Sequence, residues 1–433
     1  MKRFLKKHVG LIILLAIILA FPVSMSTQAR LNMRIIITGL AIDKTEQGYE
    51  VTAQIVKTAP GSGSEKSGST IDFVTDTGDT IVSAISKLSY KSGKIAGFSH
   101  TNFILIGKEM LEENLIKTLN YFLRDTLIKD SVLLLVAKES ANKEIKNTKE
   151  LGLSVGLEIQ KVFVYKEKES DGVMTSLVSF MNRSLNHSKT SVASVLSMNS
   201  DSSNNGQNSG SQNSSSSESG GQNGGEQGSS QSQGGESSSS SSSSGSDEKS
   251  SESNTKYFDS ITPIACFVGG KFVGNLESDE EILGYLYAQQ KCISEDISLD
   301  GLNYSQLKNA KVGIDVKNKK CIKKIRFEND TPCLDISIRI SNSSLKEIQN
   351  EELIQVVKND EFEFIKKKLA EHISKTVAKT FEKSKELKAD IFGAFDIANK
   401  YHYEKTNQNF KSMEAFLEKL KLNVEVKVSR LEY

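Results

Sequence analysis

The chain has 433 residues, which is long enough for two or three domains. Its 55 basic and 54 acidic residues leave a formal net charge of +1, so the strongly basic surface of a nucleic-acid-binding protein is excluded. Hydrophobic residues make up only 37% of the chain, but a polar tract described below lowers this fraction. The remaining chain carries enough Ile, Leu, Val and Phe to form hydrophobic cores.

Residues 1–29 have the pattern of an export signal. A basic start is followed by an apolar core, and no formal charge occurs from His8 to Ala29 when His is neutral. This stretch of about 22 residues could span a bilayer core of about 30 Å. Thr27-Gln28-Ala29 is also a suitable cleavage site, so a cleaved signal and a retained anchor both fit. Either way, we expect the following chain on the exported face of the membrane.

Residues 30–198 are expected to form an N-terminal α/β domain. Runs rich in β-branched and apolar residues predict strands at 33–43, 48–57, 101–107 and 131–138. Apolar residues at helical spacing predict helices at 79–93 and 109–125, the first of them ending at Gly93. The end of the domain, from 140 to 185, reads as mainly helical. This order predicts a sheet covered by helices.

A polar tract follows at residues 199–256. It consists almost entirely of Ser, Gly, Asn and Gln with scattered acids. Such a segment cannot bury enough apolar surface to offset its conformational entropy. We therefore expect a disordered linker, with a root-mean-square span on the order of 40 Å, that divides the chain into two lobes.

Residues 257–433 are expected to form a C-terminal α/β domain. It opens with a hairpin over 261–276, with a tight turn at Gly269-Gly270, and Ser278 and Glu281 then form a helix-capping pattern. The further predicted elements are strands at 310–316, 321–327, 333–340 and 422–433, and a long amphipathic helix at 351–387. The expected fold class is α+β, with two mixed α/β lobes. A division into three small domains is the alternative.

The 4 cysteines all lie in the C-terminal half. A hairpin centred between Cys321 and Cys333 would offset these residues by roughly 20 Å along the strands, which is too far for a disulfide. No C-x-x-C motif occurs, so neither a redox site nor a zinc knuckle is indicated. Buried free thiols are the favoured interpretation.

No catalytic, cofactor or metal site is indicated by the sequence. Among the 5 histidines only His100 has a suitable place, just before a buried strand, and a lone His is more often structural. No complete phosphate-binding loop occurs, and the acids at 278–281 are typical of a helix start rather than of a calcium site. These features favour an exported, membrane-tethered binding or assembly protein over an enzyme.

Five short motifs carry a resemblance to a known family. They are "ITGLAIDK" with Gly39 and Asp43, "AGFSHTNFILIGKEM" with Gly97, His100 and Gly107, "FLRD" with Arg124 and Asp125, "CFVGGKFVGNLESDEEILGYLY", and "LKADIFGAF" with Asp390, Phe392 and Gly393. In this order they resemble the spore-germination GerAC family, the C subunits of the nutrient germinant receptors of endospore-forming bacteria. The resemblance covers nearly the whole chain except the polar tract.

The resemblance implies a lobed α/β protein without enzymatic activity or cofactor, on the outer face of the spore inner membrane. It also implies two partners, a multi-pass A subunit and a transporter-like B subunit. Family members are usually lipoproteins, but no Cys stands near the signal end of this chain, at "FPVSMSTQ". Lipidation is therefore not expected, which favours retention of residues 1–29 as the anchor.

The motif residues are interpreted as structural or interaction positions. In "LKADIFGAF", Gly393 is predicted to be the stop signal beyond the long helix, Asp390 to lie at a turn or cap, and Phe392 and Phe395 to fold back onto the helix or sheet. The leading hypothesis is a non-enzymatic ectodomain subunit of a germinant receptor. The alternative is a receptor-independent envelope adaptor or ligand-binding module of the same fold. The identity of the germinant, and its contact with this chain, stay open.

Overall fold

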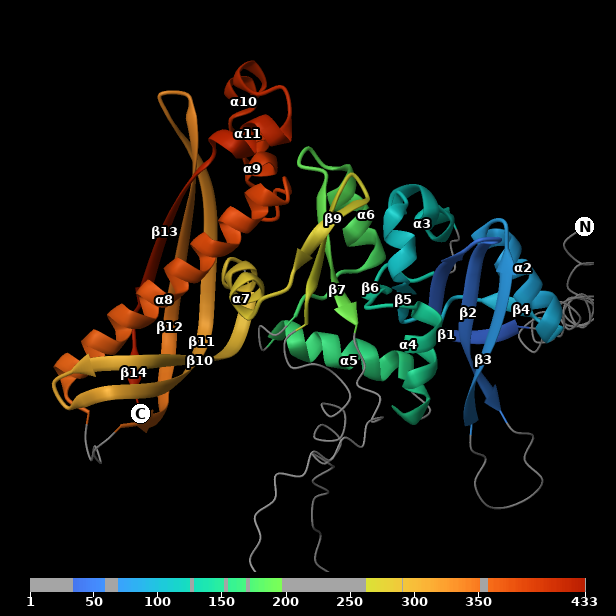
Figure 1. The fold of residues 1–433 in the computed structure, drawn as a ribbon, viewed down its shortest axis with the longest axis horizontal. Coiled ribbons are helices and arrows are strands. Elements are labelled where there is room, and N and C mark those ends of the chain that lie inside the picture. The colour runs from blue at the N-terminus through green and yellow to red at the C-terminus, as the bar shows by residue number, and fades with distance from the viewer. Residues whose placement is uncertain are drawn as a thin grey trace, which may run out of the picture.

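The protein is an α+β fold with two β-sheets and flanking helices (Figure 1). The computed structural model describes residues 34–58, 69–124, 128–151, 155–168, 172–196, 262–289, 291–350 and 357–432. The predicted signal or anchor and the predicted linker lie outside the described residues. None of the helices within these ranges is long and apolar enough to cross a membrane.

The first sheet has the strand order β3-β2-β1-β5-β6-β7-β8-β9, with β4 paired to the start of β1. Its strands are β1 (Arg34–Thr45), β2 (Gly48–Thr58), β3 (Ser69–Gly78), β4 (Ile95–Gly97), β5 (Phe103–Ile106), β6 (Leu133–Ala137), β7 (Thr190–Leu196), β8 (Ile264–Val268) and β9 (Lys271–Leu276). The neighbouring strands β1, β5, β6 and β7 pair in parallel, and the outer strands pair antiparallel. The predicted strands are confirmed, but β3, β4 and β7 were not predicted, and in β3 the polar residues hide the pattern.

Helices cover both faces of the first sheet. They are α2 (Ile81–Ser92), the 3-10 helix η1 (Lys108–Glu112), α3 (Leu115–Arg124), α4 (Ala141–Asn147), the 3-10 helix η2 (Thr148–Leu151), α5 (Val155–Lys168) and α6 (Leu177–Leu185). One hydrophobic core holds the buried residues of α2, α3 and α6, and another holds those of α4 and α5. The helix predicted at 109–125 is instead divided into η1 and α3. Asn114 explains this, because its Oδ1 accepts a hydrogen bond from the amide of Ile116 and starts a new helix.

The second sheet is built on two long strands. Its strands are β10 (Lys291–Tyr304), β11 (Leu307–Glu328), β12 (Thr331–Gln349), β13 (Lys421–Val428) and β14 (Leu431–Glu432). The two segments predicted at 310–316 and 321–327 form one continuous strand, β11. The polar residues between them hide this continuity in the sequence, whereas pairing with β12 extends across them. Cys321 and Cys333 are buried and free, and they pair with other positions of the hairpin, as predicted.

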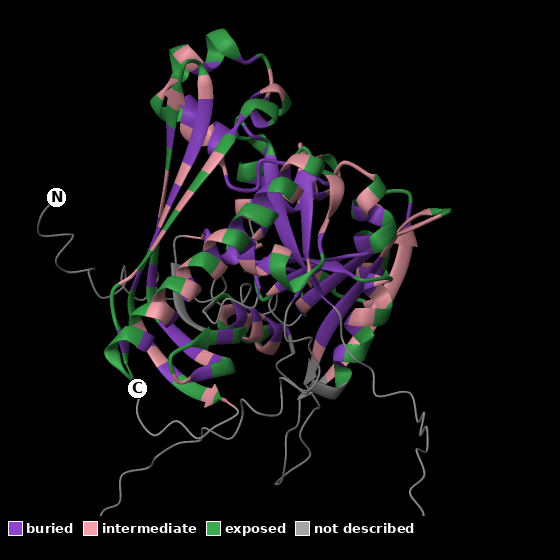
Figure 2. Cartoon of the chain, turned by 60° about the vertical axis from the view of Figure 1, so that its left-hand side comes forward, coloured by how far each residue is buried: buried purple, intermediate pink, exposed green. Residues whose placement is uncertain are grey.

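The helices of the second half are α7 (Asp279–Tyr287), α8 (Asn359–Glu386), α9 (Ala394–Tyr401), α10 (Tyr403–Asn409) and α11 (Met413–Lys419). The long helix α8 lies across the second sheet (Figure 1), and its predicted apolar stripe from Ile365 to Phe381 is buried. Figure 2 shows buried positions concentrated in the strands, while α8 keeps exposed residues on its outer side. The described helix begins at Asn359. The carboxylate of Glu361 accepts a hydrogen bond from the Lys358 amide there.

The hairpin at 261–276 forms as predicted, but it does not belong to the second sheet. Its first strand, β8, pairs antiparallel with β7, where Ser194 lies opposite Ile264. The amide of Val195 also donates to the carbonyl of Pro263 at 2.8 Å. The hairpin pattern identifies two strands and their turn, but the partner was decided by the open edge of β7. The two sides of the polar tract therefore meet within one sheet.

Candidate functional site

The "LKADIFGAF" segment forms the connection between α8 and α9. Helix α8 ends at Glu386, and Lys388 takes the left-handed conformation that closes the helix, with φ of 50°. The predicted end of this helix at 387 is therefore confirmed to within one residue, whereas the prediction that Gly393 is its stop signal is wrong. Gly393, with φ of 71°, is instead the N-cap residue of α9. Both positions need a positive φ, and the sequence showed this only for the glycine.

Asp390 caps α9 from inside the protein. It is 2% exposed, and its two carboxylate oxygens accept hydrogen bonds from the amides of Ala394 at 2.9 Å and Phe395 at 2.7 Å. The prediction that Asp390 lies at a turn or cap is confirmed. Burial raises the pKa of Asp390 to about 6, although the two backbone amides oppose this rise by stabilising the charged form.

Lys323 of β11 supports the same segment. Its Nζ donates to the carbonyl of Phe392 at 3.0 Å, and burial lowers the pKa of Lys323. The rings of Phe392 and Phe395 are buried, with Phe392 against Phe381 at 6.2 Å between ring centres. The prediction that the phenylalanines fold back onto the helix or sheet is confirmed for Phe392, whereas the ring of Phe395 lies against Phe416 of α11 at 5.2 Å between ring centres. Lys323 and these rings fix the segment against the second sheet.

The segment also contacts the first sheet. The amide of Asp390 donates to Oγ1 of Thr190, the first residue of β7, at 3.1 Å. The carboxylate of Asp396 in α9 accepts from both the amide and the hydroxyl of Ser188, each at 2.8 Å. We call these five residues, Ser188, Thr190, Lys323, Asp390 and Asp396, the junction cluster. The motif thus joins the two sheets.

Asp43 and Gly107, from two motifs of the first half, form a second arrangement. The carboxylate of Asp43 accepts from the amides of Ala141 at 2.8 Å and Asn142 at 2.7 Å, at the start of α4. Burial raises the pKa of Asp43. A Cβ at Gly107 would lie 2.0 Å from Oδ1 of Asp43, so only glycine fits beside this carboxylate. The two motifs are needed for one helix start.

The other motif residues lie apart from these arrangements. A Cβ at Gly39 would lie 2.4 Å from the ring of Phe103, which explains a glycine there. Gly97 is buried on β4, where its space is also limited. His100 and Arg124 are exposed. Asp125 lies outside the described residues.

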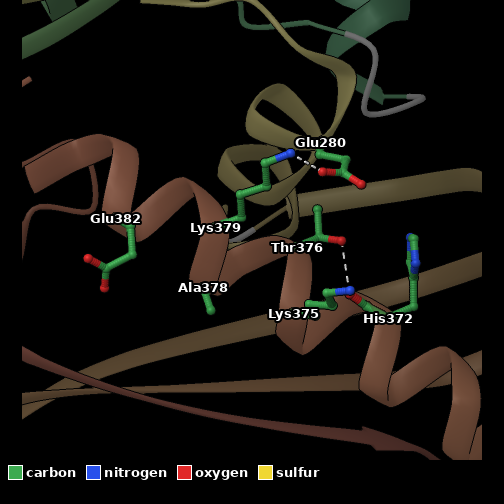
Figure 3. A pocket seen from close by; sticks show the side chains of 7 residues that line it. All are labelled: Glu280, His372, Lys375, Thr376, Ala378, Lys379 and Glu382. Atoms are coloured by element: carbon green, nitrogen blue, oxygen red, sulfur yellow. Dashed lines mark hydrogen bonds and ion pairs between the residues drawn. The ribbon is translucent and has the colours of Figure 1, made fainter. Parts of the chain in front are cut away.

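A groove of about 410 Å³ lies between α7 and α8. Its lining residues are Glu280, His372, Lys375, Thr376, Ala378, Lys379 and Glu382. Lys379 forms an ion pair with Glu280, whereas His372 and Glu382 lie at opposite ends of the groove (Figure 3). Burial lowers the pKa of His372, which is half-buried. Of the two acids in the groove, Glu382 therefore lies away from His372 and Glu280 is paired with Lys379, and the described residues contain no group suited to hold a metal ion.

Two family models match this chain. The model described as the spore germination protein N-terminal domain matches residues 27–198, and the model described as spore germination B3/GerAC like, C-terminal, matches residues 262–431. Together they take in most of the chain. The chain belongs to the spore germination GerAC family. The predicted resemblance is thereby confirmed. Membership of this family assigns the chain to spore germination, as the C subunit of a germinant receptor that also contains other subunits.

One solved structure is similar to this GerAC-family chain. It is a crystal structure described as that of the GerBC protein, with 15% sequence identity and a TM-score of 0.48. The similarity covers 91% of this chain and 96% of that chain. No curated protein matches the sequence.

The sequence interpretation missed the partners of the motif residues. Lys323, Ser188, Thr190 and Asp396 lie far from Asp390 along the chain or outside its motif, and each is a common residue on a strand, turn or helix. Lys323 lies between Ile322 and Lys324 on β11, and this local sequence gives no indication that its amine binds a carbonyl inside the protein. Only the packing of α9 against both sheets brings these residues together.

Proposed function

We propose that this chain is a non-enzymatic, membrane-tethered ectodomain subunit of a nutrient germinant receptor. It supports receptor assembly or germinant signalling beside the A and B subunits, on the outer face of the spore inner membrane. Residues 1–29 supply the tether when they are retained. Membership of the GerAC family carries this proposal.

The placement of the motif residues supports a structural role over a catalytic one. Asp43 and Asp390 use their oxygens on backbone amides, and Phe392 is buried, so none of these groups is available to a substrate. His100, the candidate for catalysis, is exposed on a turn. It is not among the residues that line the groove between α7 and α8. The recognisable residues hold helices and sheets in place, as a scaffold or signalling subunit requires.

The junction cluster supports a role in passing on a structural change. It connects β7 in the first sheet to β11 and α9 in the second half through hydrogen bonds of 2.8 to 3.1 Å. A displacement of one sheet by a receptor partner is then carried to the other, because these contacts hold α9 against both.

Deletion of the gene in the spore former that carries it tests the proposal. We expect spores without this chain to lose the response to one class of nutrient and to contain less A and B subunit in the inner membrane. The wild-type chain and a His100→Ala variant should both restore the response. Deletion spores that respond to every nutrient with unchanged A and B levels would contradict the proposal, and failure of His100→Ala alone would favour an enzyme.

A further inference from the structure

The two sheets have edge strands that differ in how their outer backbone groups are covered. Strand β3 lies at one edge of the first sheet, and β13 lies at one edge of the second sheet. The N–H and C=O groups on the outer side of an edge strand are open to pairing with another chain unless something covers them. The partners of these groups therefore show which edge is able to accept a strand.

The outward amides of β3 are bound by the strand's own acidic side chains. The amide of Phe73 donates to the carboxylate of Asp72 at 2.9 Å, and the amide of Thr77 donates to that of Asp76 at 2.9 Å. Residues two apart on a strand direct their backbone groups the same way, so both amides lie on the outer side. An added strand would have to break these contacts.

The outward carbonyls of β3 are bound by lysines of α2. The amine of Lys91 donates to the carbonyl of Thr75 at 3.0 Å, and the amine of Lys87 donates to that of Thr77 at 2.8 Å. Lysines at an edge are a common means of preventing strand addition. The first sheet is therefore closed at this edge along residues 73–77.

Strand β13 has no such cover. The amide of Ser429 donates to the carbonyl of Ile340 on β12 at 2.8 Å, so the odd-numbered residues of β13 direct their backbone groups toward β12. The even-numbered residues from 422 to 428 direct theirs outward. In the part of the chain that the structure describes, no side chain hydrogen-bonds to these outward groups. The second sheet is therefore open at this edge.

The side chains of β13 also leave room for a neighbour. The side chains of Leu422, Val424, Val426 and Val428 pack against the core below α8 but are only half-buried, whereas the residues between them are exposed. A further strand beside β13 would cover the apolar side chains. Figure 1 shows β13 at the opposite end of the fold from β3, so the open edge lies away from the closed one.

The charges of β13 are complementary to those of a second copy. When two β13 strands run antiparallel with Val426 opposite Val426, Glu425 of each copy lies opposite Lys427 of the other. Both side chains are more than half exposed, so each is able to turn to the facing copy. Centring the pair on Glu425 would bring two carboxylates together, and centring it on Val424 would place Lys421 opposite Lys427. Charge therefore favours the pair centred on Val426.

We propose that two copies of this chain associate through β13, which pairs antiparallel with β13 of the second copy about a two-fold axis. The backbone groups of Val426 point outward, so the central pair exchanges two hydrogen bonds and joins the second sheets of both copies. The contact uses the same residues on each copy and is therefore closed to a third. It concerns association of the chain with itself and does not depend on the proposed receptor partners.

Charge reversal on the full chain in detergent tests this pairing. We expect light scattering to give the mass of two copies for the wild type. Glu425→Lys and Lys427→Glu each place like charges opposite at two points, so each should raise the dissociation constant at least tenfold. A mixture of the two variants should associate like the wild type, and so should the chain that carries both changes, because opposite charges then face each other again.

The matched controls reverse charges elsewhere in the same sheet, with Lys324→Glu on β11 and Glu347→Lys on β12, both of which are exposed. They should leave the dissociation constant unchanged, and circular dichroism checks that every variant is folded. A wild type with the mass of one copy up to about 100 μM would overturn the proposal. Equal effects of the β13 variants and the controls, or no effect of either, would also overturn it, as would a mixture that fails to associate.

Distances between spin labels test the register. The chain carries Cys292→Ser, because the thiols of Cys266, Cys321 and Cys333 are buried. With Val426 at the centre, labels at Asn423→Cys should lie about 20 Å apart between copies and labels at Lys421→Cys about 34 Å apart, at about 3.4 Å per residue. Equal distances at both positions would show a parallel pair, and the lack of any distance between copies would show another interface. Either result would overturn the proposed pairing.

Discussion

At the scale of single residues, the two motif carboxylates do the same work. Asp43 and Asp390 each accept hydrogen bonds from two consecutive backbone amides at the first turn of a helix. Without the carboxylate of Asp390, the amides of the buried residues Ala394 and Phe395 would be left unpaired away from water, whereas the site of Asp43 is half-buried. The two differ in the sequence separation between the carboxylate and the helix that it caps. Asp390 caps the next helix, whereas Asp43 caps a helix about a hundred residues later along the chain.

Asp390→Asn should change how stability depends on pH. Folded Asp390 keeps its proton up to about pH 6, whereas the unfolded side chain releases it near 3.8. Between these values the folded state binds more protons, so the free energy of unfolding of the wild type falls as pH rises, by on the order of 3 kcal/mol through this group. Asn stays neutral and lacks this fall. Urea unfolding of both proteins from pH 4 to 7 measures the difference, and a difference that does not vary with pH would contradict the prediction.

Gly107→Ala should destabilise the protein by about 1–3 kcal/mol, because the added Cβ would meet Oδ1 of Asp43. Gly313→Ala is the matched control, since its Cβ would have the nearest atom at 3.6 Å, and it should change stability little. Adding Asp43→Ala should make Gly107→Ala less harmful. Urea unfolding of the single and double variants gives the coupling, and additive effects would show that the carboxylate is not what excludes a side chain.

At the scale of elements, the position of α8 depends on close contact with α7. A Cβ at Gly284 of α7 would lie 2.1 Å from Oγ1 of Thr380 and 2.4 Å from the carbonyl of Thr376. Oγ1 of Thr380 also donates to the carbonyl of Glu281 at 2.9 Å. The absence of a side chain at Gly284 therefore lets the two helix backbones approach each other, and α7 in turn follows the hairpin of β8 and β9.

Gly284→Ala should destabilise the protein by about 1–3 kcal/mol, although alanine in a helix interior usually gains about 0.5–1 kcal/mol over glycine. The clash with the Thr376 carbonyl explains the opposite sign. Thr380→Ala removes only the hydroxyl, so it should not rescue Gly284→Ala. Thermal unfolding of the single and double variants checks this. A stabilising Gly284→Ala would show that α7 and α8 can separate freely.

At the scale of the whole molecule, the two lobes are not independent units joined by a tether. Strand β8 lies on the far side of the polar tract from β7, yet the two strands pair over Thr190–Ser194 and Ile264–Val268. The junction cluster adds further hydrogen bonds between the sheets. The tract therefore connects two strands that are already neighbours, and continuity of the fold does not depend on it.

Cleavage within the tract should leave the two halves associated. A protease site inserted between Gly224 and Gly225 is expected to give two fragments that elute together in size-exclusion chromatography, because the pairing of β7 with β8 and the shared core survive the cut. The same sample in denaturant should separate and so shows that cleavage was complete. Fragments that separate in native buffer would contradict the pairing and favour lobes linked only by the tract.

The sequence by itself determined the features that depend on neighbouring residues. These include the end of α2 at Gly93, the turn at Gly269-Gly270, the capping box of Ser278, the buried stripe of α8 and the family motifs. Each follows from backbone dihedral preferences, side-chain capping or periodicity over a few residues, which the local sequence contains.

Only the tertiary structure decided which elements meet. It paired β8 with β7, merged two predicted strands into β11, and made Gly393 the N-cap of α9 instead of the stop signal of α8. It also brought Lys323 and Ser188 to the "LKADIFGAF" segment. Strand pairing and burial depend on which edges and surfaces the rest of the chain leaves open, and no short stretch of sequence contains that information.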